Sequence, residues 1–211
     1  ENVRIEDVAT PEAFKQNPEK VLSFYNSRRQ QLFSGQVKPN EAHKSLAKLS
    51  RELGDRVLLI TQNVDKLLEE AGACNILHMH GELSKLRCDA CAHVCYWDKD
   101  IDMDTACPSC GETGELRPHV VWFGEIPFGL EKIYTALSQC EIFASIGTSG
   151  SVYPAGGFVQ EARKGSCQKT IEINPEQTEI TGFFDKFVRA KATEGVPDFV
   201  KTVLEDYSHK R

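Results

Sequence analysis

The fold class is decided by residues 56–65, which carry the sequence RVLLITQNVD. One charged residue is followed by a short apolar run, and the run stops at Thr61-Gln62-Asn63. A short, continuously apolar run is typical of a strand that is buried on both faces of a parallel sheet. The polar residues that follow predict a loop at the carboxyl end of this strand, which is where ligands bind in such sheets.

Three similar runs follow, at residues 76–79, 142–146 and 170–173, and each ends in polar or glycine-rich residues. Helix-like segments lie between them, for example residues 130–138 and 153–164. Strands that alternate with helices indicate a parallel α/β sheet. The sequence therefore predicts an α/β protein whose functional groups gather at the strand ends.

Residues 10–53 have the features of helices. Thr10-Pro11-Glu12 and Asn17-Pro18-Glu19 each combine a capping residue, a first-turn proline and an acid. Asn40 is predicted to cap a further helix, which Gly54 ends.

The alternation of strands and helices is interrupted at residues 81–116, which are rich in cysteine and poor in periodic apolar residues. This composition predicts a small inserted module. Two tight pairs stand in it, Cys88-Asp-Ala-Cys91 and Cys107-Pro-Ser-Cys110. A two-residue gap lets one turn offer two thiolates to one zinc ion, and four cysteines leave no open coordination position, so the zinc is expected to be structural. Two disulfides or free thiols are the alternative, as is a site in which Cys95 replaces Cys91. The other cysteines (Cys74, Cys140 and Cys167) are expected to be small buried hydrophobic residues.

The bulk composition narrows the class of protein. The net charge is −6 and the pI is near 5.6, and the sequence shows no basic stripe of the kind that binds duplex nucleic acid. Both features argue against duplex nucleic acid as a partner. The longest uncharged stretch, residues 142–160, contains several glycines and Pro154 and does not read as a membrane span. No signal peptide is found, and the spacing of the eight cysteines favours a metal site in a reducing compartment over a secreted disulfide scaffold.

The loop after the first strand carries Gln62, Asn63 and Asp65. Amides can read a carboxamide and an acid can hold a ribose hydroxyl, although a capped turn explains the same residues. His80 stands beside Gly81 at the end of the next strand. Its pKa near the working pH suits a general base, while a hydrogen-bonded surface histidine is the plainer interpretation.

The two later strands end in a similar way. Gly147-Thr148-Ser149 is a flexible polar turn that could meet phosphate or ribose, and Asn174 stands where it could contact a ribose hydroxyl. Residues 117–125 form an extended aromatic stretch. An exposed edge there could pair with an extended peptide, whereas burial in the core is the usual fate of such residues.

Together these clusters resemble the sirtuins, and they do so in the order of that family over nearly the whole chain after residue 5. The resemblance is carried by the following residues: 61–65, His80-Gly81, the paired cysteines, 118–125, Gly147-Thr148-Ser149 and 173–176. It points most closely to bacterial deacylases related to the mitochondrial desuccinylase branch.

The resemblance implies a Rossmann-type NAD-binding domain, at residues 41–80 and 117–211, and a small domain. The small domain would combine a helical module at residues 1–40 with a zinc module at residues 81–116. The implied activity is NAD-dependent deacylation of protein lysines, with nicotinamide and O-acyl-ADP-ribose as products. The implied partners are acylated lysine side chains, without membrane or nucleic acid.

The same resemblance assigns roles to individual residues. His80 would be the general base, and Cys88, Cys91, Cys107 and Cys110 would hold zinc. The cofactor would be bound by Gln62, Asn63, Asp65, Gly147, Thr148, Ser149, Asn174, Glu176 and Ala192. The peptide and its acyl-lysine would be bound by Val121, Phe123, Gly124 and Glu125.

Tyr25 and Arg28 are three residues apart on one helix and therefore share a face. They resemble the tyrosine-x-x-arginine signature of the desuccinylase branch. A guanidinium pairs with a carboxylate through two hydrogen bonds, and a phenol adds another. The resemblance thus implies a preference for succinyl, malonyl or glutaryl lysine, with acetyl also accepted. A packed tyrosine beside a solvated arginine is the alternative that the residues alone favour.

The chain opens with Glu1, and the glycine-rich segment that begins the family's fold is not found in it. We expect that segment to precede Glu1 in a longer natural protein and to supply the first, central strand. Because a missing central strand leaves unpaired backbone and exposed apolar neighbours, this piece alone is expected to bind NAD poorly and to be less stable.

Three other functions compete with deacylation. The same fold could transfer ADP-ribose to protein, but an arginine that reads a carboxylate has no purpose there. A zinc-ribbon binding module would explain residues 88–110 but not the strand-end clusters. A classical NAD oxidoreductase would need the GxGxxG fingerprint, which these residues lack. The bacterial resemblance predicts a cytoplasmic location, with mitochondria as the alternative.

Overall fold

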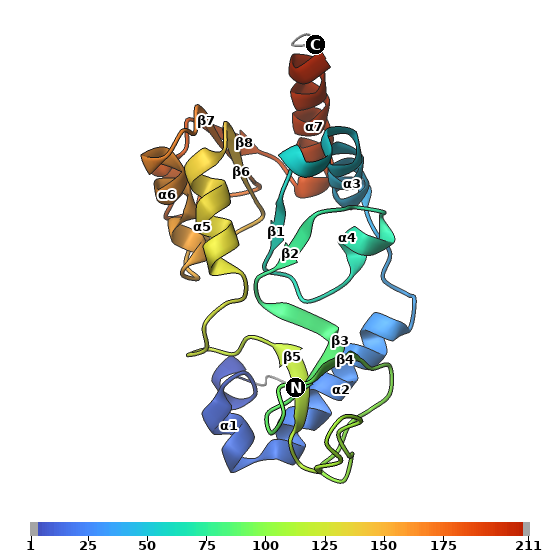
Figure 1. The fold of residues 1–211 in the computed structure, drawn as a ribbon. Coiled ribbons are helices and arrows are strands. Elements are labelled where there is room, and N and C mark those ends of the chain that lie inside the picture. Colours follow the sequence, from blue (N-terminus) through green and yellow to red (C-terminus); the bar gives the residue numbers. More distant parts are fainter. Residues whose placement is uncertain (1–3, 209–211) are drawn as a thin grey trace. The chain divides into compact units, whose positions relative to one another are not determined.

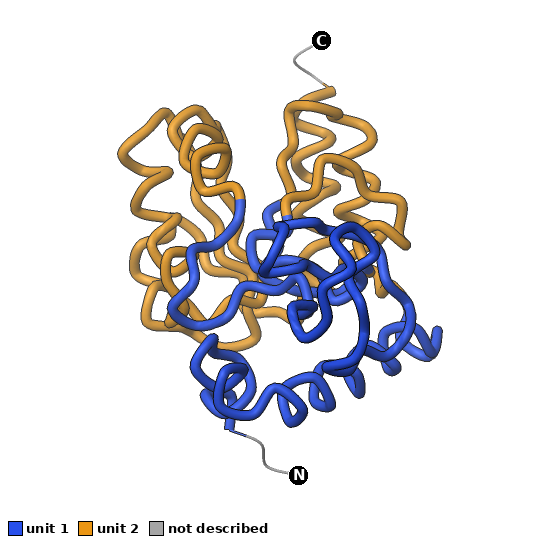
Figure 2. The backbone as a smooth tube through the Cα atoms, turned by 60° about the horizontal axis from the view of Figure 1, so that its bottom comes forward, with its two compact units in different colours: residues 1–38, 60–66, 78–128 blue, residues 39–59, 67–77, 129–211 orange. Residues whose placement is uncertain are grey.

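The computed structural model describes residues 4–208, which form two compact units (Figure 2). Unit 1 comprises residues up to 38 together with 60–66 and 78–128, and unit 2 comprises 39–59, 67–77 and 129 onward. The sequence-based division instead groups 60–66, 78–80 and 117–128 with the NAD-binding domain. The last of these stretches belongs to unit 1 because its strand pairs with the strand that follows His80.

The helices of unit 1 begin at the predicted caps. After a short 3-10 turn, η1 (Ile5–Asp7), come α1 (Pro11–Gln16) and α2 (Pro18–Phe33). The Thr10 hydroxyl accepts a hydrogen bond from the Ala13 N–H at 3.0 Å, and the Asn17 side chain accepts one from the Lys20 N–H at 3.0 Å. These side chains satisfy N–H groups that the first helical turn cannot, so both capping predictions are confirmed.

An antiparallel sheet follows in unit 1, and its strands are β3 (Gly81–Cys88), β4 (Val94–Tyr96) and β5 (Leu116–Val120). The strand order is β4-β3-β5, and the β3–β5 register shifts between Glu82 and Leu86. These three strands were not predicted from the sequence. The shift breaks the simple alternation of apolar and polar residues that would have revealed β3.

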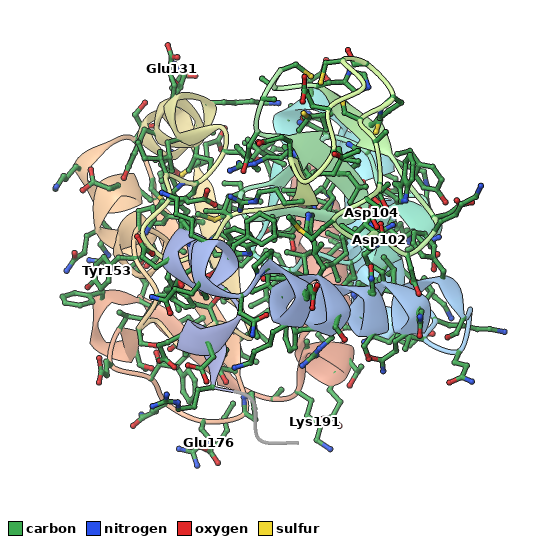
Figure 3. The ribbon with its side chains drawn as sticks, turned by 90° about the horizontal axis from the view of Figure 1, so that it is seen from below. Asp102, Asp104, Glu131, Tyr153, Glu176 and Lys191 are labelled. Carbon is green, nitrogen blue, oxygen red and sulfur yellow. The ribbon has the colours of Figure 1, made fainter. Side chains whose placement is uncertain are left out.

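Helix α2 packs against this sheet through one apolar face. Val21, Leu22 and Tyr25 are buried against residues of β3 and β5 such as Leu83 and Leu86. Asn26 exchanges two hydrogen bonds with the backbone of Ile101, so the loop that carries Asp102 and Asp104 lies along the same helix (Figure 3).

The first predicted strand starts later than expected. Gly54–Arg56 form the 3-10 turn η2, and β1 runs over Leu59–Thr61. Its partner is β2 (Ile76–His78). Leu59 N–H donates to Asn75 C=O, and Met79 N–H donates to Thr61 C=O. These bonds advance in the same direction along both strands, so the strands are parallel, as predicted.

Unit 2 is built on a three-stranded parallel sheet. Its strands are β6 (Ile142–Ile146), β7 (Lys169–Asn174) and β8 (Lys186–Arg189), in that order. Ile142 pairs with Lys169 and Ile146 with Ile173, while Ile171 pairs with Lys186. The first two strands were predicted. The third was missed, because it has only two apolar residues, both half-buried, between two exposed charged ones, and so has no long apolar run.

The helices of unit 2 are α3 (Glu41–Leu53), α4 (Leu67–Glu70), α5 (Leu130–Gln139), α6 (Phe158–Lys164) and α7 (Ala192–Ser208), with 3-10 turns η3 (Ala155–Gly157) and η4 (Thr181–Phe183). Helix α3 starts at the predicted Asn40 cap and ends at Gly54. Helices α3 and α7 pack together, as do α5 and α6 (Figure 1). Ile171, Ile173 and Val196 are central to the core. Among residues 4–208, no helix is both long and apolar enough to cross a membrane.

Candidate active site and metal centre

His80 lies two residues after the end of β2 and is half-buried in unit 1. Its Nδ1 is 3.2 Å from the backbone carbonyl oxygen of Gln62. A carbonyl oxygen only accepts, so Nδ1 carries the proton and Nε2 has the lone pair. Burial lowers the pKa of His80, against the opposing effect of the Gln62 carbonyl. The imidazole is therefore neutral at pH 7 and oriented as a base.

Gly81 allows a neighbouring strand to approach this histidine. Its φ of 81° is left-handed, and a Cβ built on it would lie 2.1 Å from the carbonyl oxygen of His119. The backbone N–H of Val121 donates to the carbonyl oxygen of His80 at 2.9 Å. Any larger residue at position 81 would displace β5, so the glycine holds the catalytic candidate against residues 119–121.

The loop after β1 lies beside His80 in unit 1. Asn63 N–H donates to the Thr61 hydroxyl at 3.0 Å, and Leu83 N–H donates to the Val64 carbonyl at 2.9 Å. Through the Gln62 carbonyl this loop also contacts His80. Gln62 and Asp65 are half-buried and Asn63 is exposed. The structure thus brings the predicted nicotinamide-side residues next to the predicted base.

The segment after β5 forms a turn that Glu125 holds in place. The Glu125 carboxylate accepts two hydrogen bonds from Arg117, at 2.8 and 2.9 Å, one from Arg87 at 2.8 Å and one from the Trp122 N–H at 2.8 Å. Burial raises the pKa of Glu125, but the hydrogen bonds from Arg117 and the Trp122 N–H together with the charges of Arg117 and Arg87 outweigh burial, so the net pKa is lowered. Glu125 therefore orients the turn that presents Phe123, which is 55% exposed.

Tyr25 and Arg28 have different environments on α2. Tyr25 is buried, and its hydroxyl accepts a hydrogen bond from Trp122 Nε1 at 2.9 Å. Burial raises the pKa of Tyr25, so the phenol stays neutral. Arg28 is exposed, with its guanidinium carbon 5.0 Å from the centre of the Phe24 ring. Tyr25 thus contacts Trp122, which lies in the predicted peptide-binding segment 121–125, and Arg28 is one turn further along the same helix.

Two buried arginines of this unit were not predicted. The Arg117 guanidinium carbon is 3.2 Å from the centre of the Trp122 ring, and only 2% of the residue is exposed. Arg29 is also buried and donates to the backbone carbonyls of Leu83, Trp97 and Lys99. Helical spacing offered a signal for Arg29, since it is four residues after Tyr25 and lies on the same face.

The four paired cysteines form two similar turns. Ala92 N–H donates to the Cys88 carbonyl and Gly111 N–H donates to the Cys107 carbonyl, both at 2.9 Å. Both donors are left-handed, with φ of 58° for Ala92 and 79° for Gly111. The backbone N–H groups of Cys110 and Ser109 lower the pKa of Cys107 to about 7, which favours the thiolate that a metal requires.

The spacing of the sulfur atoms fits zinc. Sγ of Cys88 is 3.8 Å from that of Cys110, Sγ of Cys91 is 3.8 Å from that of Cys107, and all four lie within 4.8 Å of one another. A tetrahedral zinc ion with Zn–S bonds of about 2.3 Å needs sulfur atoms about 3.8 Å apart. A disulfide would need about 2.05 Å. The four-cysteine prediction therefore holds over the disulfide alternative, and Cys95 is not in the cluster.

The other cysteines are not small buried residues. Cys74 is exposed, and Cys140 and Cys167 are partly exposed. That expectation was wrong because these residues stand in connections beside the strands of unit 2, not within its packed core.

Unit 2 carries the predicted ribose and phosphate residues at the carboxyl ends of its strands. Gly147, with φ of 62°, follows β6 and donates its N–H to the Ile173 carbonyl at 2.9 Å. The Asn174 side chain donates to the Thr148 carbonyl at 2.9 Å. The Ser149 hydroxyl is 2.8 Å from that of Ser151. Parallel strands end together here, which is the edge where α/β sheets bind ligands.

Two further predicted residues lie near this edge. Ala192 is the first residue of α7, and the nearby Ala190 N–H donates to the Asn174 carbonyl at 3.2 Å. Glu176 is exposed and its side chain points outward, as does that of Lys191 (Figure 3). The predicted site residues therefore fall into two groups, one in each unit.

Comparison with known proteins connects these features to one family. The family model described as Sir2 family matches residues 1–154. The NAD-dependent protein deacylase of Pasteurella multocida (strain Pm70) is 51% identical over 204 residues, which are 97% of this chain and 87% of that protein.

Solved structures agree. A mutant Sir2 homologue in complex with 2'-O-acetyl ADP ribose is similar with a TM-score of 0.84 and 36% identity, over 97% of this chain and 81% of that one. A Sir2 protein bound to a myristoylated histone peptide is similar with a TM-score of 0.77 and 32% identity, over 97% of this chain and 87% of that one.

Proposed function

This chain belongs to the Sir2 family and is an NAD-dependent protein deacylase, and we propose that it removes acidic acyl groups such as succinyl and malonyl as well as acetyl from protein lysines. The observation that carries the catalytic part of the proposal is the 3.2 Å contact between Nδ1 of His80 and the carbonyl oxygen of Gln62. Nδ1 is held by this carbonyl, so a neutral Nε2 is available as the base.

NAD, when bound, supplies the ADP-ribose group that takes up the acyl group. His80 takes up a proton at Nε2, as a general base with a lowered pKa does. Gln62, Asn63 and Asp65 hold the nicotinamide end beside His80. Thr148, Ser149 and Asn174 hold ribose and phosphate at the strand ends of unit 2, with Gly147, Glu176 and Ala192 around them.

The peptide is held by the turn after β5. Val121, Phe123 and Gly124 contact its backbone and the acyl-lysine stem, while Glu125 fixes their conformation through Arg117 and Arg87. Strand β5 is an edge strand of its sheet, so the residues that follow it in the sequence can pair with an extended peptide through main-chain hydrogen bonds.

The acyl preference rests on Tyr25 and Arg28. Tyr25 stays a neutral phenol and contacts Trp122, which lies in the proposed peptide-binding turn of residues 121–125. Arg28 is exposed on the same helix, and its guanidinium can pair with a carboxylate at the end of an acyl chain. An acetyl group has no such carboxylate and does not need the arginine.

We place the protein in the bacterial cytoplasm, with lysine-acylated proteins as partners. Its bacterial relatives and the four-cysteine site, which requires reduced thiols, support this location.

The test is turnover of matched acetyl-lysine and succinyl-lysine peptides by the full-length protein, followed by mass spectrometry with and without NAD. Arg28→Met should lower kcat/KM for the succinyl peptide about 10- to 100-fold, because a hydrogen bond to a charged group contributes about 1.5–3 kcal/mol. Acetyl turnover should change less than about threefold, and Arg28→Lys should retain part of the succinyl activity.

Lys15→Met is the matched control, since it removes an exposed positive charge from the preceding helix. It should leave both activities unchanged. Equal losses on the two peptides in Arg28→Met would refute the carboxylate role of Arg28. Absence of NAD-dependent turnover of either peptide would refute the catalytic proposal.

A further inference from the structure

Cys140 and Cys167 stand side by side at the starts of two neighbouring strands of unit 2. Ile142 of β6 is paired with Lys169 of β7, and each cysteine lies two residues before one of these partners. The same parallel register therefore places Cys140 opposite Cys167. Residues two apart in extended chain point to the same face, so both side chains lie on one side.

Hydrogen bonds hold the two connecting segments together at this point. Ser166 N–H donates to the Ser138 carbonyl at 3.1 Å, and Gln168 N–H donates to the Glu141 carbonyl at 2.8 Å. The Ser166 hydroxyl also donates to the Cys140 carbonyl at 3.3 Å. Neighbouring strands are about 4.8 Å apart, which is within the Cα separation of about 4.4–6.8 Å that a disulfide needs.

The two thiols are close enough to affect each other and open enough to react. Both residues are partly exposed. Burial and the neighbouring Cys167 thiol raise the pKa of Cys140 to about 12, so Cys140 stays protonated at neutral pH. Cys167 is therefore the thiol that reacts first. The four cysteines of the metal cluster differ, because zinc would occupy their sulfur atoms.

We propose that Cys140 and Cys167 are a redox modification site, at which the dithiol is converted reversibly into a disulfide by exchange with a small disulfide such as oxidised glutathione. The Cys167 thiolate attacks one glutathione sulfur, forms a mixed disulfide and releases one glutathione thiolate. Cys140 then loses its proton, attacks Sγ of Cys167 and releases the second glutathione. The protein loses two electrons, and one glutathione disulfide becomes two thiols.

The crosslink would join the starts of β6 and β7, whose other ends carry Gly147 and Asn174. It would close the loop of residues 140–167, which contains α6. Constraining a loop of this length in the unfolded chain should raise Tm by about 5–10 °C. This inference does not depend on the deacylase activity and is tested without it.

The experiment uses the zinc-loaded full-length protein, incubated with either oxidised or reduced glutathione, alkylated and digested with trypsin without reduction. Cleavage after lysine and arginine places Cys140 in the peptide 133–163 and Cys167 in the peptide 165–169. The oxidised sample should contain these two peptides linked by a disulfide, and dithiothreitol should separate them. The same sample should show the higher Tm.

Cys167→Ser should abolish both the linked peptide and the rise in Tm. Cys74→Ser is the matched control, since Cys74 is an exposed thiol of the same unit, and it should retain both. Separate glutathione adducts on Cys140 and Cys167, or alkylation of both while Cys74 is oxidised, would overturn the proposal. The wild-type peptide map decides the matter even if a variant fails to fold.

Discussion

Arg29 and Arg28 are adjacent on α2, but their side chains have opposite environments. Arg28 is exposed, whereas Arg29 is 1% exposed and donates to the carbonyls of Leu83, Trp97 and Lys99. Leu83 belongs to β3, and the other two acceptors lie in the chain after β4. The Arg29 side chain thus joins helix α2 both to strand β3 and to the segment that follows β4.

We therefore expect Arg29→Met to destabilise the protein by about 2–4 kcal/mol, because three carbonyl groups lose their hydrogen-bond donor in a buried site. Urea unfolding followed by far-UV circular dichroism measures this loss. Arg28→Met makes the same chemical change on the exposed face and should alter the free energy of unfolding by less than about 0.5 kcal/mol. Equal stability of the two variants would show that the buried hydrogen bonds contribute nothing net.

The pH dependence of the reaction follows from His80. Burial lowers its pKa, so the neutral base is the dominant form above its ordinary value of 6.5 and is lost only when the pH falls further. We predict that kcat/KM for the acetyl peptide is level near neutral pH and declines on the acid side with an apparent pKa below 6.5. His80→Gln should lower kcat/KM about 10²- to 10⁴-fold. An acid limb above pH 6.5 would contradict this assignment.

At the scale of elements, the zinc turns contribute to the core as well as to the metal site. Cys88 and Cys107 are buried in one cluster with Leu22 of α2 and Leu86 of β3. Metal binding and packing of α2 are therefore coupled, because loss of the turns removes apolar contacts from the helix. Structural zinc contributes folding free energy directly in sites of this kind.

We expect Cys110→Ser to lose zinc and to lower Tm by about 10 °C or more, since a closed four-thiolate site tolerates no missing ligand. Zinc content measured by atomic emission and thermal unfolding test this together. Cys95→Ser is the control, because Cys95 lies in β4 outside the cluster and should retain one zinc per chain. Equal zinc contents in the two variants would mean that the cluster is not the metal site.

The elements differ in how far the sequence predicts them, and the reasons are physical. Asn40 and Gly54 mark α3 because capping is local chemistry within one turn. β6 was found because four of its five residues are apolar, and β7 because Ile171 and Ile173 precede the polar turn that begins at Asn174. β3 was missed because its pattern is broken by the shift between Glu82 and Leu86, and its pairing with β5 depends on residues far away in the sequence.

At the scale of the whole molecule, the predicted site residues divide between the two compact units. His80, Arg28 and the zinc cysteines belong to unit 1, while Thr148 and Asn174 belong to unit 2. The sequence order of the motifs was enough to predict the family, while the roles of the individual residues stay predictions. It did not reveal that Glu125 is bound by Arg117, since that contact depends on the side-chain packing of a turn that carries no periodic signal.

The division between units leads to a prediction about additivity. Asn174 holds the Thr148 carbonyl at the strand ends of unit 2, so Asn174→Ala should raise KM for NAD about tenfold. Arg28→Met should instead raise KM for the succinyl peptide. Because the two residues lie in different units and are proposed to bind different ligands, the free-energy effects on kcat/KM should add to within about 0.5 kcal/mol in the double variant.

A cycle inside unit 1 serves as the comparison. Tyr25→Phe and Arg28→Met both remove groups that are proposed to hold one acyl carboxylate, so their effects on succinyl turnover should be coupled by about 0.5–3 kcal/mol. Tyr25→Phe also removes the acceptor of the Trp122 hydrogen bond, and acetyl turnover measured in parallel separates that structural effect from carboxylate binding. Strong coupling between Asn174→Ala and Arg28→Met would contradict the proposal that these residues bind different ligands. Strict additivity of Tyr25→Phe and Arg28→Met would contradict the proposal that these two side chains bind the same carboxylate.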